Sequence, residues 1–422
     1  MSVTTTGGAS AGTPRALRVL LIHQLFVLGR EAGGTRHVEL ARHLVRRGHE
    51  VTVVASPISY LTGERHAPVD EGAEEGLTLL RTWTYRPRSS GFVARVLSFL
   101  SFSTSSAVAA LFRVPSVDVV WGTSPPLFQA AAAVMVARLR RVPFVLEVRD
   151  LWPDFAVELG VLRNPLVIRL ARWLERFVYD HADEVVVNSP GFVGHLEARG
   201  VDPSRITLVP NGVEVSDFDP DARGQAFVRE LGLDPARHRL VVYTGAHGIP
   251  NDLDVLLDAA HRLRHRADAR FVLVGGGRDK DRLEARARDR RLDNVVFVAP
   301  QPKERMPEIL AAASVCVAHL KPIPLFDTTY PNKVFDYMAA GRPTVLGIDG
   351  VIRRVVEDAD GGCWVQPGDP AAMARAVAGY LDDPEAAEAA GRRARAYVAE
   401  HFDREDQAET LRGVLERAGR GR

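Results

Sequence analysis

Short apolar, β-branched segments alternate with amphipathic helical patterns along almost the whole chain, and this alternation limits the folds that the sequence can adopt. It is typical of an α/β protein in which helices cover both faces of a parallel sheet. A first series of predicted strands covers 18–22, 51–55, 77–82, 117–121, 144–148 and 184–188. A second covers 206–209, 240–244, 270–274, 294–298, 315–318, 343–346 and 362–365. The sequence therefore predicts two doubly wound parallel-sheet domains in succession.

The join between the domains is predicted near Asn211–Pro220, where Asn-Gly and an acidic stretch that ends in proline break the pattern. We expect a first domain over 15–212, a second over 213–395 and a C-terminal helical segment over 396–422. The last helical pattern, about 385–418, is expected to bend near His401–Asp403. Residues 1–14 are small and polar, lack the features of a signal peptide and are expected to be disordered.

Composition excludes several functional classes. The chain has 422 residues, of which 46% are hydrophobic and 25% charged, as is ordinary for a soluble globular protein. A net charge of +1 argues against a nucleic-acid binder driven by overall charge. Cys316 and Cys363 form no disulfide or metal pattern, and they fit a reducing compartment, so we expect a cytoplasmic protein. No His/Asp/Glu cluster has metal-ligand spacing, and no metal is expected.

The segment Pro331–Val345 carries the strongest functional signal. A proline-led start and a Gly341–Pro343 stop predict a short helix with a free N-terminus. Free N–H groups there attract an anion, and Lys333 adds a positive charge. Asn332 and Asp336 lie on the same face, and a carboxylate there can accept hydrogen bonds from a diol. These groups match the diphosphate and ribose of a nucleotide; the alternative is a buried amphipathic helix with a structural Gly-Pro stop.

Polar residues also follow a predicted strand of the first domain, in the run Leu146–Asp154. Arg149 and Asp150 come at the carboxyl end of the strand, where ligands of open α/β sheets bind. A carboxylate beside an arginine and Trp152 is well placed to meet a sugar, so Asp150 and Arg149 are the catalytic candidates. The alternative is a structural Arg-Asp pair that closes the strand end.

The segment 92–113 is unusually apolar, with no charge from Val96 to Phe112 between Arg95 and Arg113. It is slightly short for a membrane-spanning helix and carries a Ser/Thr cluster. One interpretation is a pair of packed helices in the first domain. The other is a surface that meets a membrane or a lipid-linked acceptor, with anionic headgroups bound by three arginines upstream, Arg81, Arg86 and Arg88.

Together, Pro331–Val345, the run from Ala32 to Val53 and the Arg-Asp-Leu-Trp-Pro run at Arg149 resemble family 4 glycosyltransferases of the GT-B fold. The resemblance covers roughly residues 17 to 416, and Ser124–Leu127 and the Arg149 run are similar to a bacterial branch that builds surface polysaccharides. It implies two Rossmann-like domains, an interdomain cleft and a C-terminal helix that crosses back to the first domain. It further implies a retaining, metal-independent transfer from a nucleoside-diphosphate sugar to an acceptor hydroxyl (EC 2.4).

The resemblance also assigns donor contacts. Gly33 and Gly34 would contact the donor from the first domain, and Gly245 and His247, in the loop Tyr243–Asp252, would do so from the second. Two features depart from the family: this loop lacks its usual Arg and Lys, and Thr328 stands where a glutamate is usual, eight residues before Asp336. Sugar contacts would then fall to the segment formed by Asp327, Thr328, Thr329 and Tyr330.

The acceptor is expected to be a polysaccharide, a lipid-linked glycan or a natural product, and the enzyme is expected to need no cofactor. Peripheral contact with the inner face of the membrane through 92–113 is one further expectation. Two other functions stay open at this point. One is a nucleotide-sugar epimerase or hydrolase on the same fold; the other is a catalytically inert protein that binds the sugar nucleotide.

Overall fold

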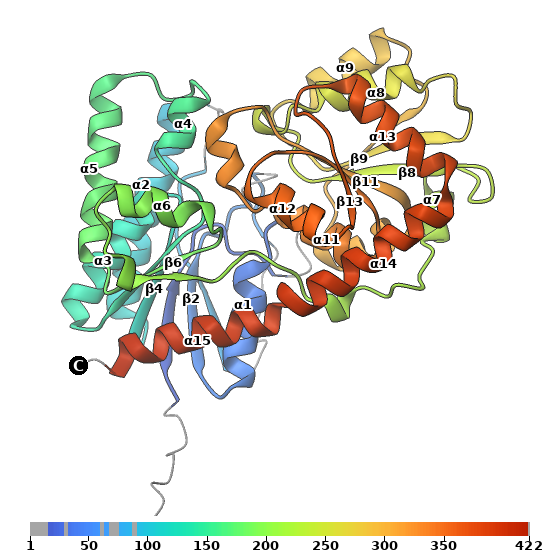
Figure 1. The fold of residues 1–422 in the computed structure, drawn as a ribbon. Helices are drawn as coiled ribbons and strands as arrows, with labels where there is room; N and C mark the ends of the chain where they lie inside the picture. Colours follow the sequence, from blue (N-terminus) through green and yellow to red (C-terminus); the bar gives the residue numbers. More distant parts are fainter. Residues whose placement is uncertain (1–15, 29–32, 60–62, 67–75, 87–90, 421–422) are drawn as a thin grey trace, which may run out of the picture.

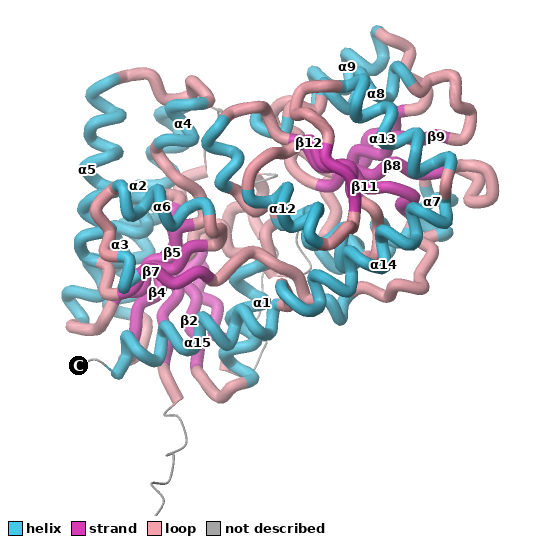
Figure 2. The backbone as a smooth tube through the Cα atoms, in the orientation of Figure 1, coloured by secondary structure: helices cyan, strands magenta, loops and turns pink. Residues whose placement is uncertain are grey.

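The computed structural model describes residues 16–28, 33–59, 63–66, 76–86 and 91–420. These residues form two α/β units that lie side by side, each with a parallel sheet between helices (Figures 1 and 2). The predicted two-sheet α/β class is therefore confirmed. The expectations for residues 1–14 and for Arg88 lie outside the described residues.

The first sheet has seven parallel strands in the order β3-β2-β1-β4-β5-β6-β7. They are β1 (Arg18–Ile22), β2 (Glu50–Ala55), β3 (Leu77–Arg81), β4 (Val119–Ser124), β5 (Phe144–Val148), β6 (Glu184–Val187) and β7 (Ile206–Leu208). Strand order reverses between β1 and β4, and such a switch point opens a crevice at the carboxyl ends of the strands.

The second sheet has six parallel strands in the order β10-β9-β8-β11-β12-β13. They are β8 (Arg239–Thr244), β9 (Ala269–Val274), β10 (Val295–Val298), β11 (Ala313–His319), β12 (Thr344–Gly347) and β13 (Gly362–Trp364). One strand assignment was wrong: 206–209 was predicted to open the second series, but β7 pairs with β6 at the edge of the first sheet. The chain leaves that sheet only after β7.

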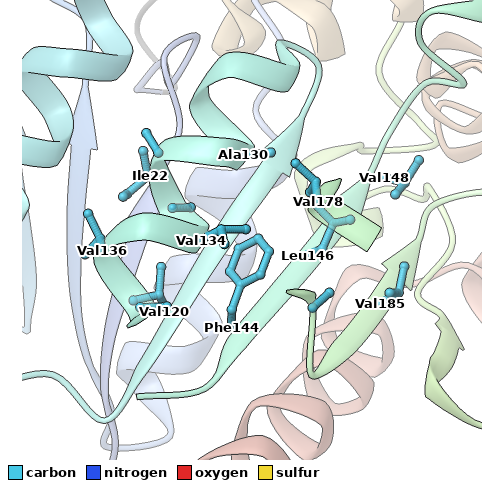
Figure 3. Packing of buried hydrophobic residues seen from close by; sticks show 14 of the residues in the cluster. Ile22, Val120, Ala130, Val134, Val136, Phe144, Leu146, Val148, Val178 and Val185 are labelled. Carbon is cyan, nitrogen blue, oxygen red and sulfur yellow. The ribbon is translucent and has the colours of Figure 1, made fainter. Parts of the chain in front are cut away.

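Helices cover both faces of the first sheet. On one face, Leu20 and Ile22 of β1 pack with α2 (Phe92–Phe112), α3 (Leu127–Arg140), α5 (Pro165–His181) and α6 (Gly191–Ala198). Figure 3 shows the centre of this layer, where side chains of β4, β5 and β6 meet those of α3 and α5. On the other face, Val19 and Leu21 pack with α1 (Arg36–Arg46) and α15 (Arg404–Arg420). Strand residues alternate between the two cores, as the pleat requires.

The second sheet is covered in the same way. Its two cores are completed by α7 (Gln225–Glu230), α8 (Asp254–Arg262), α9 (Lys280–Asp289), α10 (Met306–Ala311), α11 (Asn332–Ala339), α12 (Val351–Asp358), α13 (Pro370–Asp382) and α14 (Pro384–His401). Local sequence sets several helix starts. The carboxylate of Asp369 accepts the backbone N–H groups of Ala371 and Ala372, and Pro370 occupies the first turn of α13.

The apolar segment 92–113 forms one continuous helix, α2, and not the predicted pair of helices. Four of its hydroxyls bond back to carbonyls of the preceding turn, as Ser101 does to Ser98 and Thr104 to Leu100, whereas that of Ser103 has no partner among the described residues. These bonds satisfy the hydroxyls without breaking the helix. By length and composition Val93–Phe112 could cross a membrane, but one side of the helix is built into the first core through Phe102 and Ala110.

The predicted bend in the last helix is present between α14 and α15. α14 packs on the second unit, and α15 lies along the first sheet (Figure 1). At the crossing, the Val213 N–H donates to the Phe402 carbonyl, and the Arg404 N–H donates to the Val213 carbonyl. The chain therefore crosses between the two units twice, and the two crossing segments lie next to each other.

We predict that Leu411→Ala lowers the free energy of unfolding by about 2–5 kcal/mol, because Leu411 is wholly buried between α15 and the first sheet. Urea unfolding followed by circular dichroism measures the change. Thr410→Ala, one residue away on the exposed side of α15, is the matched control. Equal stability of the two variants would show that α15 is not docked in solution.

Candidate active site

The carboxyl ends of the two sheets border two adjoining cavities. The cleft cavity, about 510 Å³, is lined by first-unit residues such as His37 and Asp150 and by second-unit residues such as Tyr330. The donor cavity, about 420 Å³, is lined by the loops after β8 and β9, by Lys303 and by the start of α11. Gly34, Pro331 and Asn332 line both cavities. The two predicted halves of the site are therefore contiguous.

The start of α11 faces the donor cavity. Pro331 precedes the helix, and no side chain caps its first N–H groups. The Lys333 amine donates to the Tyr243 hydroxyl at 2.7 Å and to Asn251 Oδ1 at 3.0 Å, and it lies 4.1 Å from the centre of the Tyr243 ring. Burial without a counter-charge lowers the pKa of Lys333 to about 7. A diphosphate at this helix start would supply the missing negative charge.

Glycines bring backbone close to this amine. Gly245 has a φ of 135°, and a Cβ there would lie 2.9 Å from Lys333 Nζ. Gly275 has a φ of 149°, and its Cβ would overlap the carbonyl oxygen of Gly245. Gly275 and Gly276, which follow β9, line the donor cavity. Only glycine fits these positions without moving the loop or the lysine.

Asp336 lines the donor cavity beside Asn332 and Lys333, as predicted from their spacing. Its carboxylate pairs with Lys303, with Nζ and Oδ1 2.5 Å apart. Burial raises the pKa of Asp336, and the positive charge of Lys303 opposes the rise. Sequence reasoning missed Lys303, which precedes α10 and belongs to no recognisable motif. Lys303 therefore adds a second positive charge, besides that of Lys333, to a donor site whose loop after β8 lacks the Arg and Lys that are usual in the family.

His247 was a predicted donor contact, but it does not line the donor cavity. Its side chain is wholly buried between the rings of Tyr243 and Phe297. Neither ring nitrogen has a hydrogen-bond partner among the described residues. Burial lowers its pKa to about 4, so the imidazole is neutral at physiological pH. His247 supports the loop through its backbone, which bonds to Gly276 and Asp279.

A buried charged cluster beneath the first-unit side of the cleft was not predicted. Glu147 of β5 accepts from Arg36 Nε at 2.8 Å and from Trp121 Nε1 at 3.1 Å, and it lies 2.9 Å from His37 Nε2. Burial would raise the pKa of Glu147, but the charges and hydrogen bonds of His37 and Arg36 outweigh it and hold the pKa below its ordinary value. Burial lowers the pKa of His37 to about 4. At neutral pH an ionised Glu147 therefore balances Arg36, and His37, which becomes charged only below about pH 4, is neutral.

Arg149 and Asp150 follow Glu147 by two and three residues, just past the end of β5, and both line the cleft cavity. The Arg149 guanidinium donates to the Pro125 carbonyl at 3.1 Å, while its Nε has no partner in the described part of the chain. Asp150 opens into the cleft. The surrounding protein raises its pKa to about 6, against the opposing charge of Arg149. Asp150 can thus be a carboxylate, able to accept a hydroxyl proton, at neutral pH.

The segment predicted to contact the sugar divides in two. Thr329 and Tyr330 line the cleft cavity, whereas Asp327 and Thr328 do not. Asp327 lies against Gly350, and Thr328 is held by the first unit, since its carbonyl accepts from Ser189 at 2.5 Å. Phe326 stacks on Phe155 of the first unit at 5.3 Å. This segment therefore joins the units as well as lining the cleft.

No group of three or more His, Cys, Asp or Glu side chains in the described residues is arranged to hold a metal ion.

Two glycosyltransferase family models match the chain, one in each unit. The first, a glycosyl transferase 4-like domain, matches residues 32–212, and the second, glycosyl transferases group 1, matches residues 238–383. With the two parallel sheets and the cleft between them, these matches show that the chain belongs to the group 1 (family 4) glycosyltransferases of the GT-B fold. The predicted family is confirmed.

Among individual relatives, the chain is 29% identical over 318 residues to WcaI of Escherichia coli K12, a glycosyl transferase assigned to colanic acid biosynthesis; the match covers 73% of this chain and 77% of WcaI. It is 31% identical over 226 residues to D-inositol 3-phosphate glycosyltransferase of Salinispora arenicola, covering 50% of this chain and 49% of that protein.

Solved structures share the fold at lower identity. Sucrose-phosphate synthase of Thermosynechococcus elongatus aligns with a TM-score of 0.73 and 20% identity, over 95% of this chain and 98% of the synthase. Anabaena HepE in complex with UDP and glucose aligns with a TM-score of 0.72 and 15% identity, over 94% of this chain and 99% of HepE.

We predict that Glu147→Gln lowers stability by about 3–5 kcal/mol, because it leaves the buried Arg36 without its counter-charge. It should also reduce turnover, because Arg36 and His37 line the cleft. Glu175→Gln, at another buried glutamate paired with Arg199 on the far side of the unit, is the control and should spare turnover in the folded fraction. Unfolding curves and activity measured on the same samples separate the two effects, and unchanged stability of Glu147→Gln would contradict the prediction.

Proposed function

We propose that the protein transfers a sugar, with retention of configuration, from a nucleoside-diphosphate sugar to an acceptor hydroxyl. The observation that carries the proposal is the uncapped start of α11, where the half-buried Lys333 amine is held by Tyr243 and Asn251 and lines the donor cavity together with Asp336. Family membership supports the reaction class. HepE, which shares the fold, has been crystallised with UDP-glucose, and this supports a nucleotide sugar as donor.

The donor would occupy the donor cavity and extend into the cleft. Its diphosphate would meet the first N–H groups of α11, Lys333 and the backbone at Gly245, with Gly33 and Gly34 opposite, since both line the same cavity. Asp336 would accept the ribose hydroxyls. The transferred sugar would extend toward Thr329 and Tyr330, which line the adjoining cleft.

Leaving-group stabilisation is the main chemical task. As the glycosidic bond breaks, negative charge develops on the diphosphate, and a fixed helix start with a buried ammonium group stabilises that charge. Because the amine is already desolvated by Tyr243 and Asn251, little reorganisation is needed when the charge appears.

The acceptor hydroxyl would bind on the same face of the sugar as the leaving group, oriented by Asp150. Arg149 also lines the cleft, beside the acceptor and the sugar. A closed cleft limits access of water, which is a competing acceptor. The contacts of Phe326 and Thr328 with the first unit keep the two sides of the cleft together.

We also propose that the protein works in the cytoplasm at the inner face of the membrane. α2 exposes Val93, Leu97, Leu100, Val108 and Phe112. The neighbouring α3 and α5 add Met135, Leu139, Leu166, Leu170 and Trp173 on the outer side of the first unit (Figure 1). Contiguous exposed apolar side chains of this kind mark an interaction surface.

Donor binding tests the proposal. A thermal-shift panel of UDP, GDP, TDP and ADP sugars identifies the donor, because a ligand of the native state raises the melting temperature. With that donor, Lys333→Ala and Asp336→Ala should each raise Kd by about tenfold to a hundredfold in calorimetry. Lys321→Ala, which removes the same charge outside both cavities, is the control and should not change Kd. Unchanged affinity in both test variants would refute the nucleotide assignment.

The two shifted pKa values predict a pH profile. In the free enzyme Asp150 is a carboxylate only above about pH 6, so kcat/KM for the acceptor should fall below that pH, and Asp150→Asn should remove this limb along with most of the turnover. Lys333 loses its proton above about pH 7 in the free enzyme, so kcat/KM for the donor should fall there. Donor binding at pH 8 should then take up about one proton, measured by calorimetry in buffers of different ionisation enthalpy. No proton uptake would show that Lys333 does not meet the diphosphate.

A further inference from the structure

A third cavity, here called the α2 cavity, adjoins the active site on the side away from the donor. It has a volume of about 280 Å³ and lies between α2 and the start of α3. Asp150, Trp152, Ala156 and Val161 line both this cavity and the cleft cavity. A ligand can therefore extend from the catalytic candidate Asp150 into the α2 cavity without leaving the protein.

The lining of the α2 cavity is unsuited to a sugar. Its walls are apolar and include Val96 and Phe99 of α2, Leu127 and Phe128 of α3, and Leu162. Among the described residues that line it, only Arg95 and Asp150 are charged. A sugar buried there would leave its hydroxyl groups without partners, at a cost in free energy for each one. A hydrocarbon chain has no polar groups that would lose hydrogen bonds in such a site, and its transfer out of water lowers the free energy.

Arg95 adds a cation to this apolar site. Its guanidinium has no ion pair and no hydrogen bond to any residue that the structure describes. Arginine binds phosphate through parallel N–H donors. The cavity thus offers a carboxylate at the end that it shares with the cleft, a cation at Arg95 and an apolar wall. A sugar joined through phosphate to a hydrocarbon chain has one part that suits each of these three groups.

The outer end of the cavity meets the exposed apolar surface of α2. Val96 and Phe99 line the cavity, and the neighbouring Leu97 and Leu100 on the same helix are exposed. A chain longer than the cavity would leave it beside apolar side chains and continue into a bilayer that the α2 surface contacts.

We propose that the α2 cavity binds the first carbons of the isoprenoid or alkyl chain of a lipid-phosphate-linked acceptor. Arg95 contacts the acceptor phosphate, and Asp150 orients the hydroxyl of the acceptor sugar. This inference rests on the proposed function and narrows its acceptor class from any hydroxyl compound to a sugar carried on a lipid phosphate.

The test uses farnesyl phosphate and dimethylallyl phosphate, which share a headgroup and differ in chain length, with inorganic phosphate as a third probe. Calorimetry is run below the aggregation concentration of the lipid. Each further methylene buried should tighten binding about fourfold, so farnesyl phosphate should bind the full-length protein more than about tenfold more tightly than dimethylallyl phosphate. Equal affinity for the two chain lengths would overturn the proposal.

Matched variants separate the cavity from the outer surface. Val96→Glu places a charge in the cavity wall and should weaken farnesyl phosphate binding more than about tenfold. Val108→Glu makes the same change on the exposed side of the same helix, outside the cavity, and should leave that binding unchanged while weakening attachment to anionic vesicles. Arg95→Gln should weaken both isoprenoid phosphates by a similar factor. Equal losses in the two glutamate variants would mean that the lipid binds the outer surface and not the cavity.

Donor binding is measured in parallel on every variant. If the donor binds and farnesyl phosphate does not, the acceptor inference is wrong and the proposed donor site stands. If no nucleotide sugar binds the wild-type protein, the proposed function itself fails and the acceptor inference fails with it. Val96, Val108 and Arg95 do not line the donor cavity, so donor affinity also reports that each variant is folded.

Discussion

The ionised, fully buried Glu147 is the interaction on which the first-unit side of the active site depends. It joins β5 to the first turn of α1 through Arg36 and His37, and Arg36 continues to the carbonyls of Val209 and Pro210, where the chain leaves the first sheet. Removing a carboxylate from water is costly, and only a full set of partners offsets that cost. Once those partners are in place, Glu147 fixes the positions of the glycine loop before α1, the end of β5 that carries Asp150, and the connection between the two units.

In the second unit, the positively charged side chains of the donor cavity are positioned by different contacts. Lys333 is held by a phenol and an amide, and Lys303 is held by Asp336. Both cations are therefore positioned in the free protein without the anion that the proposed function brings to them. A site prepared in this way binds its ligand without first having to order long side chains, whose lost rotamer freedom would weaken binding.

The sequence predicted most of the fold because strands buried on both faces stand out as β-branched runs: β1 and β5 match their predicted limits at both ends. β7 was misplaced because a three-residue edge strand carries little pattern, and only pairing with β6 shows its sheet. Local spacing also placed Lys333 and Asp336 together in the donor cavity. Lys303, Glu147 and the burial of His247 depend on contacts between distant segments, and no local pattern in one sequence reveals them.

The double crossing of the chain restricts how the enzyme can open. Because the segments at Val213 and Phe402–Arg404 are hydrogen-bonded to each other, the two units are joined by a short two-stranded ribbon and not by a single flexible thread. A single connecting segment would let the two units rotate about it in any direction. Two hydrogen-bonded segments bend mainly in one direction and resist twisting. Opening and closing should then follow one repeatable hinge motion and return the two units to the same alignment in each catalytic cycle.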